Sequence, residues 1–339
     1  MARINIIDFA KRRVVLVLVL HLFFYGCKPK LKKQPDFIFK TALLVNEKHT
    51  WYKAFEYFKT TLEKRSSGRI EVQIYPSEQL AKEIEAIRLI QAEVIEMTVT
   101  SSSLSNWVEV MAFSEMPFLV QDSTHMKRLL NGKIGKRMEN EMLTKTGLRA
   151  LCYFQRGERH LTSNRPIKHP DDLKGLIVRV PAVTPFITAW SALGAKPTPM
   201  AFSEVFTSLQ QGTIEGQENP FAMINNAGFS EVQKYVNLTQ HVVSWVYAVV
   251  GEKQFKKLPN DLRKIFLETA KDMQAYEHKL FLKDQRIVQD LLKNKGMEFI
   301  EVDNEAFQEK CEEAIYKSLS PSMQQIYNLI KEEGTNEIL

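Results

Sequence analysis

The sequence predicts an α/β protein in which a mostly parallel sheet carries helices on both faces. From residue 36 onward, short strand-like runs alternate with longer amphipathic segments in a β-α-β-α-β order, which is typical of such sheets. Further along, a helical pattern covers 259–293, and at about 1.5 Å per residue it is long enough to cross two domains. The roughly 300 residues after the N-terminal segment are also enough for two domains with sizeable cores.

The first part of this region shows the clearest alternation. The expected strands are 37–39, 70–75 and 94–99, and the expected helices are 51–64 and 80–91. In the first helix, Trp51, Phe55 and Phe58 fall on one face, as a helix that packs on a sheet requires. Ligands of such folds bind beyond the carboxyl ends of the strands, so His49 and Ser101 are candidates for the rim of a site.

The alternation continues to the C-terminal end of the chain. The expected helices are 123–146, 185–193, 202–211, 306–318 and 320–332, and the expected strands are 148–154, 176–180, 213–217 and 242–250. Pro220 restricts the residue before it to an extended backbone, so Asn219 is expected at the end of a strand. Arg159 and Arg179 are expected at strand ends as well.

The first 26 residues have the pattern of a signal peptide. A basic region around Lys11 precedes the apolar run 14–24, which is too short to span a membrane, because that takes roughly 20 residues. Gly26 directly before Cys27 resembles the lipobox of bacterial lipoproteins, so we expect export and a lipid anchor at Cys27. An ordinary signal peptide with an incidental cysteine is the alternative. Residues 27–35 then form a tether.

The charge and the cysteines limit the partners and the crosslinks of the mature chain. The signal peptide carries four basic residues and one acidic residue, so its removal lowers the formal net charge from +6 to +3. Such a small and evenly spread charge argues against nucleic acid as a partner. Cys152 and Cys311 could pair in an oxidising compartment, but Cys152 lies in an apolar run that favours a buried free thiol.

Sequence signatures of catalysis and of cofactor or metal binding are missing. The sequence contains no GxGxxG, GxxxxGK[ST], HExxH or GxSxG motif, and its histidines show no spacing typical of a metal site. We therefore expect no enzymatic activity, no cofactor and no metal. An exported enzyme with a novel site is the alternative, and it would need a base or nucleophile that the sequence does not reveal.

Arg159, Arg179 and Asn219 remain as candidates for ligand binding. A guanidinium at a strand end is costly to bury unless an anion meets it, and it binds a carboxylate through two parallel hydrogen bonds. An amide both donates and accepts, which suits a carboxylate flanked by a hydroxyl. The three side chains could therefore bind one small acid. A structural ion pair is the other explanation for the arginines.

Several long motifs carry a family resemblance that covers residues 36–335. They are MPFL at 116–119, RVP at 179–181, LGAKPTPMAFSEVFTSLQQG at 193–212 and GQENP at 216–220. On these motifs the sequence strongly resembles the extracytoplasmic solute-binding proteins of TRAP transporters, the DctP type.

The resemblance implies a two-domain, periplasmic-binding-protein-like fold, each domain a mixed sheet flanked by helices, with a long helix spanning both. The approximate domain boundaries are 36–156 plus 245–284 for domain I and 157–244 plus 285–339 for domain II. The resemblance also implies a periplasmic protein that captures an organic acid in the cleft between the domains. The protein would deliver this acid to the small and large membrane subunits of a TRAP permease.

The resemblance can be carried to single residues. It implies that Arg179 binds the ligand carboxylate, that Arg159 is a second arginine found in many members, and that Asn219 is the asparagine of the cleft. Ser101 and Ser102 stand where sialate-binding members have a glutamate, which argues against sialate.

The ligand and two further site residues stay open at this point. The segment VPAVTPFITAW looks like that of members that take sugar acids such as uronates, with sialate and C4-dicarboxylates as the alternative ligands. His49 and Trp190 are further candidates for the site, although Trp190 could equally pack in the core. A sensory module that reports to a membrane receptor is the rival function.

Overall fold

The structure is a computed structural model that describes residues 34–335, and from Asp36 onward the chain forms one compact unit. The predicted signal peptide, the proposed lipidation site Cys27 and most of the tether lie outside the described residues. Between residues 34 and 335, no helix combines the length and the apolar character that crossing a lipid bilayer requires.

One mixed sheet runs through the described residues, with nine strands in the order β2-β1-β3-β8-β4-β7-β5-β6 and with β9 beside β8. The strands are β1 (Phe37–Ala42), β2 (Ile70–Tyr75), β3 (Met97–Thr100), β4 (Leu148–Ser163), β5 (Ile177–Val180), β6 (Lys196–Pro199), β7 (Gly216–Pro220), β8 (Tyr235–Gly251) and β9 (Glu298–Ile300). Strands β1–β3 are parallel to one another, and so are β5–β7, whereas β4 and β8 are antiparallel to their neighbours in the main order. The predicted α/β fold with a mixed sheet is confirmed.

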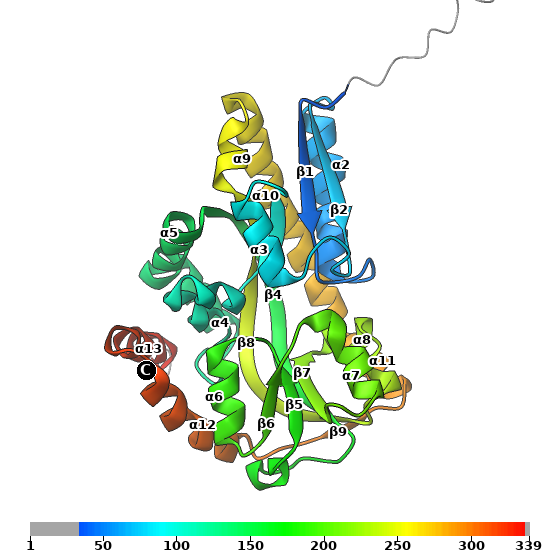
Figure 1. Ribbon diagram of the computed structural model, residues 1–339, viewed down its shortest axis with the longest axis vertical. Helices are drawn as coiled ribbons and strands as arrows, with labels where there is room; N and C mark the ends of the chain where they lie inside the picture. Colours follow the sequence, from blue (N-terminus) through cyan, green and yellow to red (C-terminus); the bar gives the residue numbers. More distant parts are fainter. Residues whose placement is uncertain (1–33, 336–339) are drawn as a thin grey trace, which may run out of the picture. The chain divides into compact units, whose positions relative to one another are not determined.

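The two long strands β4 and β8 join two halves of the sheet (Figure 1). We call the part around β1–β3 the N-terminal half and the part around β5–β7 and β9 the C-terminal half. The pairing of β4 with β8 shifts register at three places, one of them between Gln155 and Gly157. Gly157 has φ +82°, a conformation that favours glycine, and an added Cβ would lie 3.0 Å from Gln285 Nε2. Strand β4 was predicted to end at Phe154, but it continues to Ser163.

Helices cover both faces of the sheet. In the N-terminal half they are α2 (Thr50–Arg65), α3 (Glu83–Gln91), α4 (Ser123–Asn131), α5 (Lys133–Thr146), α9 (Glu252–Lys257) and α10 (Asn260–Gln285). In the C-terminal half they are α6 (Thr184–Ala192), α7 (Val205–Gln210), α8 (Phe221–Asn226), α11 (Val288–Asn294) and α12 (Asn304–Ser318). The last helix, α13 (Pro321–Thr335), packs against α4. In Figure 1, α6 and α12 lie on one side of the lower strands and α7, α8 and α11 lie on the other.

Two predicted helices are interrupted in the structure. The segment predicted as one helix over 123–146 is divided at Gly132, which ends α4 and caps α5. The long helix predicted over 259–293 ends at Gln285, and α11 begins at Val288. This break turns the chain so that Val288 and Leu292 become fully buried, and Leu292 joins the core of the C-terminal half. Helix α10 still contacts elements of both halves, namely α2 and α8.

Three apolar clusters stabilise these layers. The predicted apolar face of α2 is confirmed, because Trp51, Phe55 and Phe58 are fully buried, and Phe58 packs edge-on against Phe266 of α10 with ring centroids 5.1 Å apart. A second cluster spans both halves, and a third lies under α7, α8 and α11. Cys152 and Cys311 are buried free thiols in different clusters, as the apolar run around Cys152 predicted for that residue.

Candidate functional site

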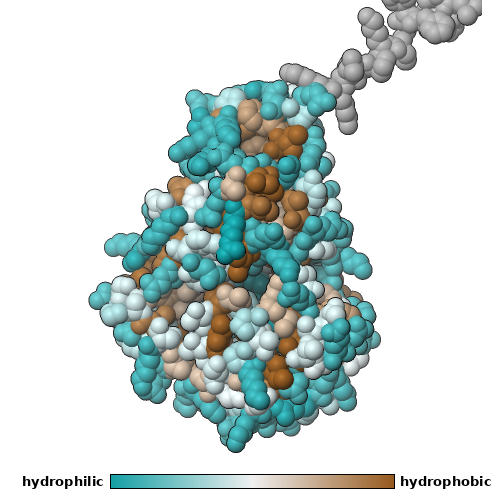
Figure 2. Space-filling view, viewed as in Figure 1, coloured by the Kyte–Doolittle hydropathy of each residue, from teal (hydrophilic) through white to brown (hydrophobic). Residues whose placement is uncertain are grey.

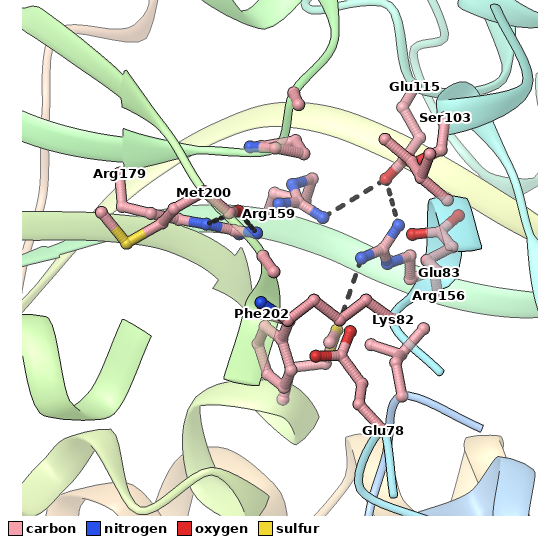
Figure 3. Close-up of a pocket in the computed structure, with 16 residues that line it drawn as sticks. Glu78, Lys82, Glu83, Ser103, Glu115, Arg156, Arg159, Arg179, Met200 and Phe202 are labelled. Carbon is pink, nitrogen blue, oxygen red and sulfur yellow. Dashed lines mark hydrogen bonds and ion pairs between the residues drawn. The ribbon is translucent and has the colours of Figure 1, made fainter. Parts of the chain in front are cut away.

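A cavity of about 200 Å³ lies between the two halves, and we call it the charged cavity. Figure 2 shows that the molecule is hollowed between its upper and lower parts on this face. The charged cavity is lined by the ionisable residues Glu78, Lys82, Glu83, Glu115, Arg156, Arg159 and Arg179. In Figure 3, Arg179 and Met200 lie on one side of the cavity, and Glu83, Ser103 and Glu115 lie on the other. Residues from both halves thus meet around one cavity.

Arg159 is held by a carboxylate of the neighbouring strand β7. Its Nε donates to Glu218 Oε2 at 2.5 Å, and its Nη2 donates to Glu218 Oε1 at 2.6 Å. This is the two-bond fork that guanidinium and carboxylate form, and Arg159 is only 1% exposed. Burial alone would raise the pKa of Glu218, but Arg159 and His241 outweigh it and lower that pKa to about 2. Arg159 and Glu218 therefore form a buried ion pair.

His241 completes the environment of Glu218. Burial lowers the pKa of His241, so the imidazole is neutral near pH 7. Its Nδ1 lies 2.8 Å from Thr239 Oγ1, and its Nε2 lies 2.9 Å from Glu218 Oε2. Glu218 is an acceptor, so the proton of the neutral ring is on Nε2 and Thr239 donates to Nδ1. The imidazole of His241 thus orients the carboxylate of Glu218, which in turn holds the guanidinium of Arg159.

Glu115, at the end of the short 3₁₀ segment Glu109–Glu115, holds the other side of the cavity together. It accepts hydrogen bonds from Arg156 Nη1, from Arg159 Nη1 at 3.3 Å, and from Ser101 Oγ at 2.6 Å. Burial opposes its ionisation, but the two arginines outweigh burial and lower the pKa of Glu115. Ser101 was predicted at the rim of the site, and the structure places it behind the cavity wall, where it orients Glu115.

Arg179, on β5, differs from both other arginines. Its Nε and Nη2 donate to the carbonyl oxygen of Met200 at 3.0 and 2.6 Å. Within residues 34–335, no carboxylate lies within the 4.0 Å of its guanidinium that an ion pair requires. Burial lowers the pKa of Arg179 to about 10, although the more distant charge of Glu218 partly opposes this. Among the residues that the structure describes, Arg179 is thus a buried cation whose side-chain hydrogen bonds go only to a neutral group.

The charges of the cavity do not cancel around these arginines. Of the three guanidiniums, those of Arg156 and Arg159 are bound to carboxylates, whereas that of Arg179 has none within ion-pair distance among the described residues. Glu83 also lines the cavity, but burial raises its pKa, with Arg156 opposing, and this favours its neutral form. A buried cation without a counter-ion is costly, so the cavity is suited to an anion with a carboxylate group.

Polar contacts between the halves close one side of the cavity. Lys82 Nζ lies 2.5 Å from Glu204 Oε1, and the backbone N–H of Ser203 donates to Glu78 Oε2 at 3.2 Å. Lys82 and Glu78 belong to the N-terminal half, whereas Glu204 and Ser203 belong to the C-terminal half. Any separation of the halves has to break these two contacts.

The other predicted site residues lie outside the charged cavity. Asn219 is fully buried in β7, donates to Gln217 Oε1 at 2.6 Å, and has no hydrogen-bond partner for its Oδ1 among the described residues. Trp190 packs in the cluster that spans both halves, with its ring 5.3 Å from that of His241. His49 caps α2 and lines a second, adjoining cavity.

Sequence reasoning did not select Glu115, Arg156 and Glu218. Two signals could have found them. Glu218 lies next to Asn219 in the GQENP motif, and Arg156 lies three residues before Arg159. A buried arginine that is predicted at a site also demands a carboxylate, and a search for that acid would have led to Glu218 and Glu115.

Comparisons with known proteins show the family to which the chain belongs. The family model of the bacterial extracellular solute-binding proteins, family 7 (DctP), matches residues 42–324. The solute-binding protein RD1_1052 of Roseobacter denitrificans is 42% identical over 287 residues, which are 85% of this chain and 88% of that protein. The 2,3-diketo-L-gulonate-binding periplasmic protein YiaO of Escherichia coli is 33% identical over 253 residues, 74% of this chain and 77% of YiaO.

Solved structures show the same fold. The crystal structure of the Roseobacter protein with bound L-galactonate has a TM-score of 0.86 at 41% identity, covering 88% of this chain and 99% of that one. A TRAP periplasmic solute-binding protein of Haemophilus influenzae with bound L-gulonate has a TM-score of 0.80 at 32% identity, covering 88% and 98%. The chain therefore belongs to the family 7 extracellular solute-binding proteins and is a solute-binding protein of the TRAP type for organic acids.

Proposed function

We propose that this protein captures a sugar acid, specifically an open-chain aldonate, and delivers it to a TRAP permease. The observation that carries the proposal is the buried, unpaired guanidinium of Arg179. A ligand carboxylate would supply the missing counter-ion and accept charge-assisted hydrogen bonds from it. The ligand identity is further supported by the sugar acids that relatives of at least 30% identity bind, namely L-galactonate, L-gulonate and D-erythronate.

An open-chain acid is favoured over the predicted uronate by the order of similarity. The structures with bound open-chain sugar acids are 31–41% identical to this chain, whereas two structures with bound β-D-galacturonate are 25% identical. The wall opposite Arg179 offers Glu83 and Ser103, whose side chains can exchange hydrogen bonds with the hydroxyl groups of the aldonate chain. The carboxylate and the hydroxylated chain would thus be bound at opposite ends of the cavity.

We propose that the protein does not change its ligand chemically. Glu115 and Glu218 are bound to arginines, and their lowered pKa values leave them poor proton acceptors.

The predicted domain boundaries and the two permease subunits belong to this proposal, as do export and lipid attachment at Cys27. Closure of the halves over the ligand would form the contacts between Lys82 and Glu204 and between Glu78 and Ser203.

Calorimetric titration of the mature protein tests the ligand and the role of Arg179. The panel is L-galactonate, L-gulonate, D-galacturonate, sialate and succinate. We expect the aldonates to bind most tightly, and Arg179→Ala to weaken their binding by about 2–4 kcal/mol, which is about 30- to 1000-fold in Kd. Arg179→Lys keeps the positive charge but lacks the planar guanidinium. Its affinity for the aldonates should lie between that of the wild type and that of Arg179→Ala.

Three outcomes would contradict the proposal. Unchanged affinity in Arg179→Ala would remove Arg179 from the carboxylate site. If sialate or succinate binds more tightly than every aldonate, the proposed identity of the ligand is wrong. Conversion of the bound acid during incubation, followed by mass spectrometry, would favour an enzyme. Uptake of the acid by vesicles that contain the permease subunits, dependent on this protein, separates transport from the rival sensory role.

A further inference from the structure

A second cavity of about 270 Å³ adjoins the charged cavity, and we call it the neutral cavity. Leu44, Phe202 and Met223 line both cavities and form the partition between them. The neutral cavity is otherwise lined by neutral polar side chains, among them His49, and by apolar groups. No Lys, Arg, Asp or Glu is among its lining residues in the part of the chain that the structure describes.

His49 offers this cavity a hydrogen-bond donor. Its Nδ1 accepts from the backbone N–H of Trp51 at 3.2 Å, which caps α2. Burial, followed by the charge of Arg156, lowers the pKa of His49 to about 3, so the ring is neutral and its proton is on Nε2. The side chain is 3% exposed, and Nε2 has no hydrogen-bond partner within residues 34–335. Nε2 is not among the fully buried polar atoms that lack a partner, so it stays accessible and can donate to an acceptor that a ligand brings into this cavity.

Other lining groups suit a hydroxylated ligand. The side chains of Ser77, Ser203 and Asn226 line the cavity and form no hydrogen bond with the described residues. The rings of Phe202 and Phe229 lie close together, with centroids 5.9 Å apart. Neutral hydrogen-bonding groups next to aromatic surfaces match the mixture of hydroxyl groups and C–H faces on a sugar ring.

The backbone is strained where the two cavities meet. Ser77 and Glu78 have φ values of +55° and +56°, in the left-handed region that residues other than glycine rarely adopt. Ser77 lines the neutral cavity and Glu78 lines the charged one. Their backbone N–H groups donate to Val45 and Leu43, both at 2.9 Å, which holds the strained turn in place. Such strain is often retained where it positions groups for a ligand.

The partition itself is deformable. Met223 has a flexible side chain, and its Sδ lies 3.5 Å from Nη2 of Arg156, which lines the charged cavity. Ligand pockets usually measure roughly 300–1,000 Å³. The volume of each cavity lies below this range, whereas the combined volume of the two cavities lies within it.

We propose that the two cavities form one two-part site, and that its ligand is an aldonate that carries a neutral glycosyl unit. The carboxylate lies against Arg179, and the glycosyl unit occupies the neutral cavity, where one of its oxygens accepts from His49 Nε2. The inference rests on the proposed function, because it places the aldonate in the charged cavity. It adds a ligand class, the aldobionates, that is longer than the simple aldonates.

Titration with matched ligands tests the proposal. Lactobionate, cellobionate and maltobionate each consist of D-gluconate with one neutral hexosyl unit, so D-gluconate is their common reference. We expect at least one of the three to bind at least ten times more tightly than D-gluconate. If none binds more tightly than D-gluconate, the two-part site is wrong. L-galactonate in the same series shows whether the charged cavity accepts aldonates, so failure of the proposed function is recognised separately.

Two filling variants locate the glycosyl unit. Ala227 lines only the neutral cavity, and Ala201 lines only the charged cavity. We expect Ala227→Phe to weaken aldobionate binding at least tenfold while the Kd for D-gluconate and L-galactonate stays within about twofold. The matched variant Ala201→Phe should weaken all of these ligands. Equal losses for short and long ligands in Ala227→Phe would overturn the assignment.

A third variant tests the donor of His49. Asparagine can still cap α2 with its side-chain oxygen, so His49→Asn preserves the helix end but removes Nε2–H. We expect a loss of roughly three- to tenfold in affinity for the aldobionate alone. A thermal unfolding midpoint close to that of the wild type shows that the variant is folded. Unchanged aldobionate affinity in this folded variant would contradict the contact with His49.

Discussion

Arg159 and Arg179 line the same cavity, but they lie in opposite electrostatic environments. Arg159 is enclosed by two carboxylates, with a two-bond fork to Glu218 and a longer contact to Glu115 at 3.3 Å. Arg179 lies two strands further along the sheet, beyond β7, and among the described residues its guanidinium donates only to the carbonyl oxygen of Met200. The first arginine is neutralised by the protein, whereas the second keeps an uncompensated charge.

This difference separates two roles that look alike in the sequence. A buried ion pair whose members satisfy each other contributes to a defined structure and has little capacity left for a ligand. A buried cation without a counter-ion raises the free energy of the empty protein and lowers it again when an anion arrives. We therefore expect Arg159 to support the shape of the site and Arg179 to bind the carboxylate.

Removal of Arg159 should have the largest effect on stability. Arg159→Ala leaves Glu218 buried beside only the neutral His241, and we expect the free energy of unfolding to fall by about 3–5 kcal/mol. Arg179→Ala removes an unpaired buried charge and should leave the stability of the ligand-free protein nearly unchanged. Urea unfolding of both variants without ligand measures the contrast.

A double variant sharpens this comparison. Arg159→Met combined with Glu218→Gln removes both charges, so we expect it to recover at least half of the stability lost in Arg159→Ala. If Arg179→Ala destabilises the empty protein as much as Arg159→Ala does, the two arginines have the same structural role.

The sequence predicted those features of the site that depend on the pattern of neighbouring residues in the chain. Arg179 stands at the end of an apolar strand before a proline, and both the strand and the position of its guanidinium at the cavity are found in the structure. The alternation of strands and helices in the N-terminal half was predictable for the same reason, because each element has its own periodicity. Pairing partners far apart in the chain leave no such pattern.

Arg159 shows why the rest could not be predicted. The predicted strand 148–154 follows the apolar run, and the polar residues around Arg159 lie beyond it. In the structure, pairing with β7 and β8 extends β4 through this polar segment, and Glu218, 59 residues away, satisfies the buried charge. The position of Ser101 behind the wall depends in the same way on Glu115, a contact between distant segments.

Acidification should weaken the Arg159–Glu218 pair. The pKa of Glu218 is about 2 in the folded protein, below the ordinary value of 4.5 that applies when the chain is unfolded. A depressed carboxyl pKa contributes stability that is fully present above the unfolded value and is lost as the pH falls towards the folded value, here from about 4.5 to about 2. The full contribution is on the order of 3 kcal/mol.

Comparison with Glu218→Gln isolates this contribution. The difference in unfolding free energy between the wild type and this variant should be constant above pH 6 and should shrink steadily between pH 4.5 and the acid limit of folding. Urea unfolding at each pH gives this difference. A difference that stays constant down to pH 3 would mean that the pKa of Glu218 is not depressed by the pair.

The contact between Lys82 and Glu204 should have the smallest effect, because both side chains are half exposed and water screens the pair. This ion pair joins the two halves at the cavity, so its loss should destabilise the closed, ligand-bound form. We expect Lys82→Ala to raise the Kd for the aldonate less than about fivefold, mainly because the ligand is released faster. Lys145→Ala, which removes an exposed ion pair with Glu141 away from the cavity, is the matched control and should leave the Kd unchanged. Stopped-flow release measurements decide the point. A loss as large as that of Arg179→Ala would show that Lys82 contacts the ligand itself, and the single uncompensated charge at Arg179 would then not suffice to explain binding.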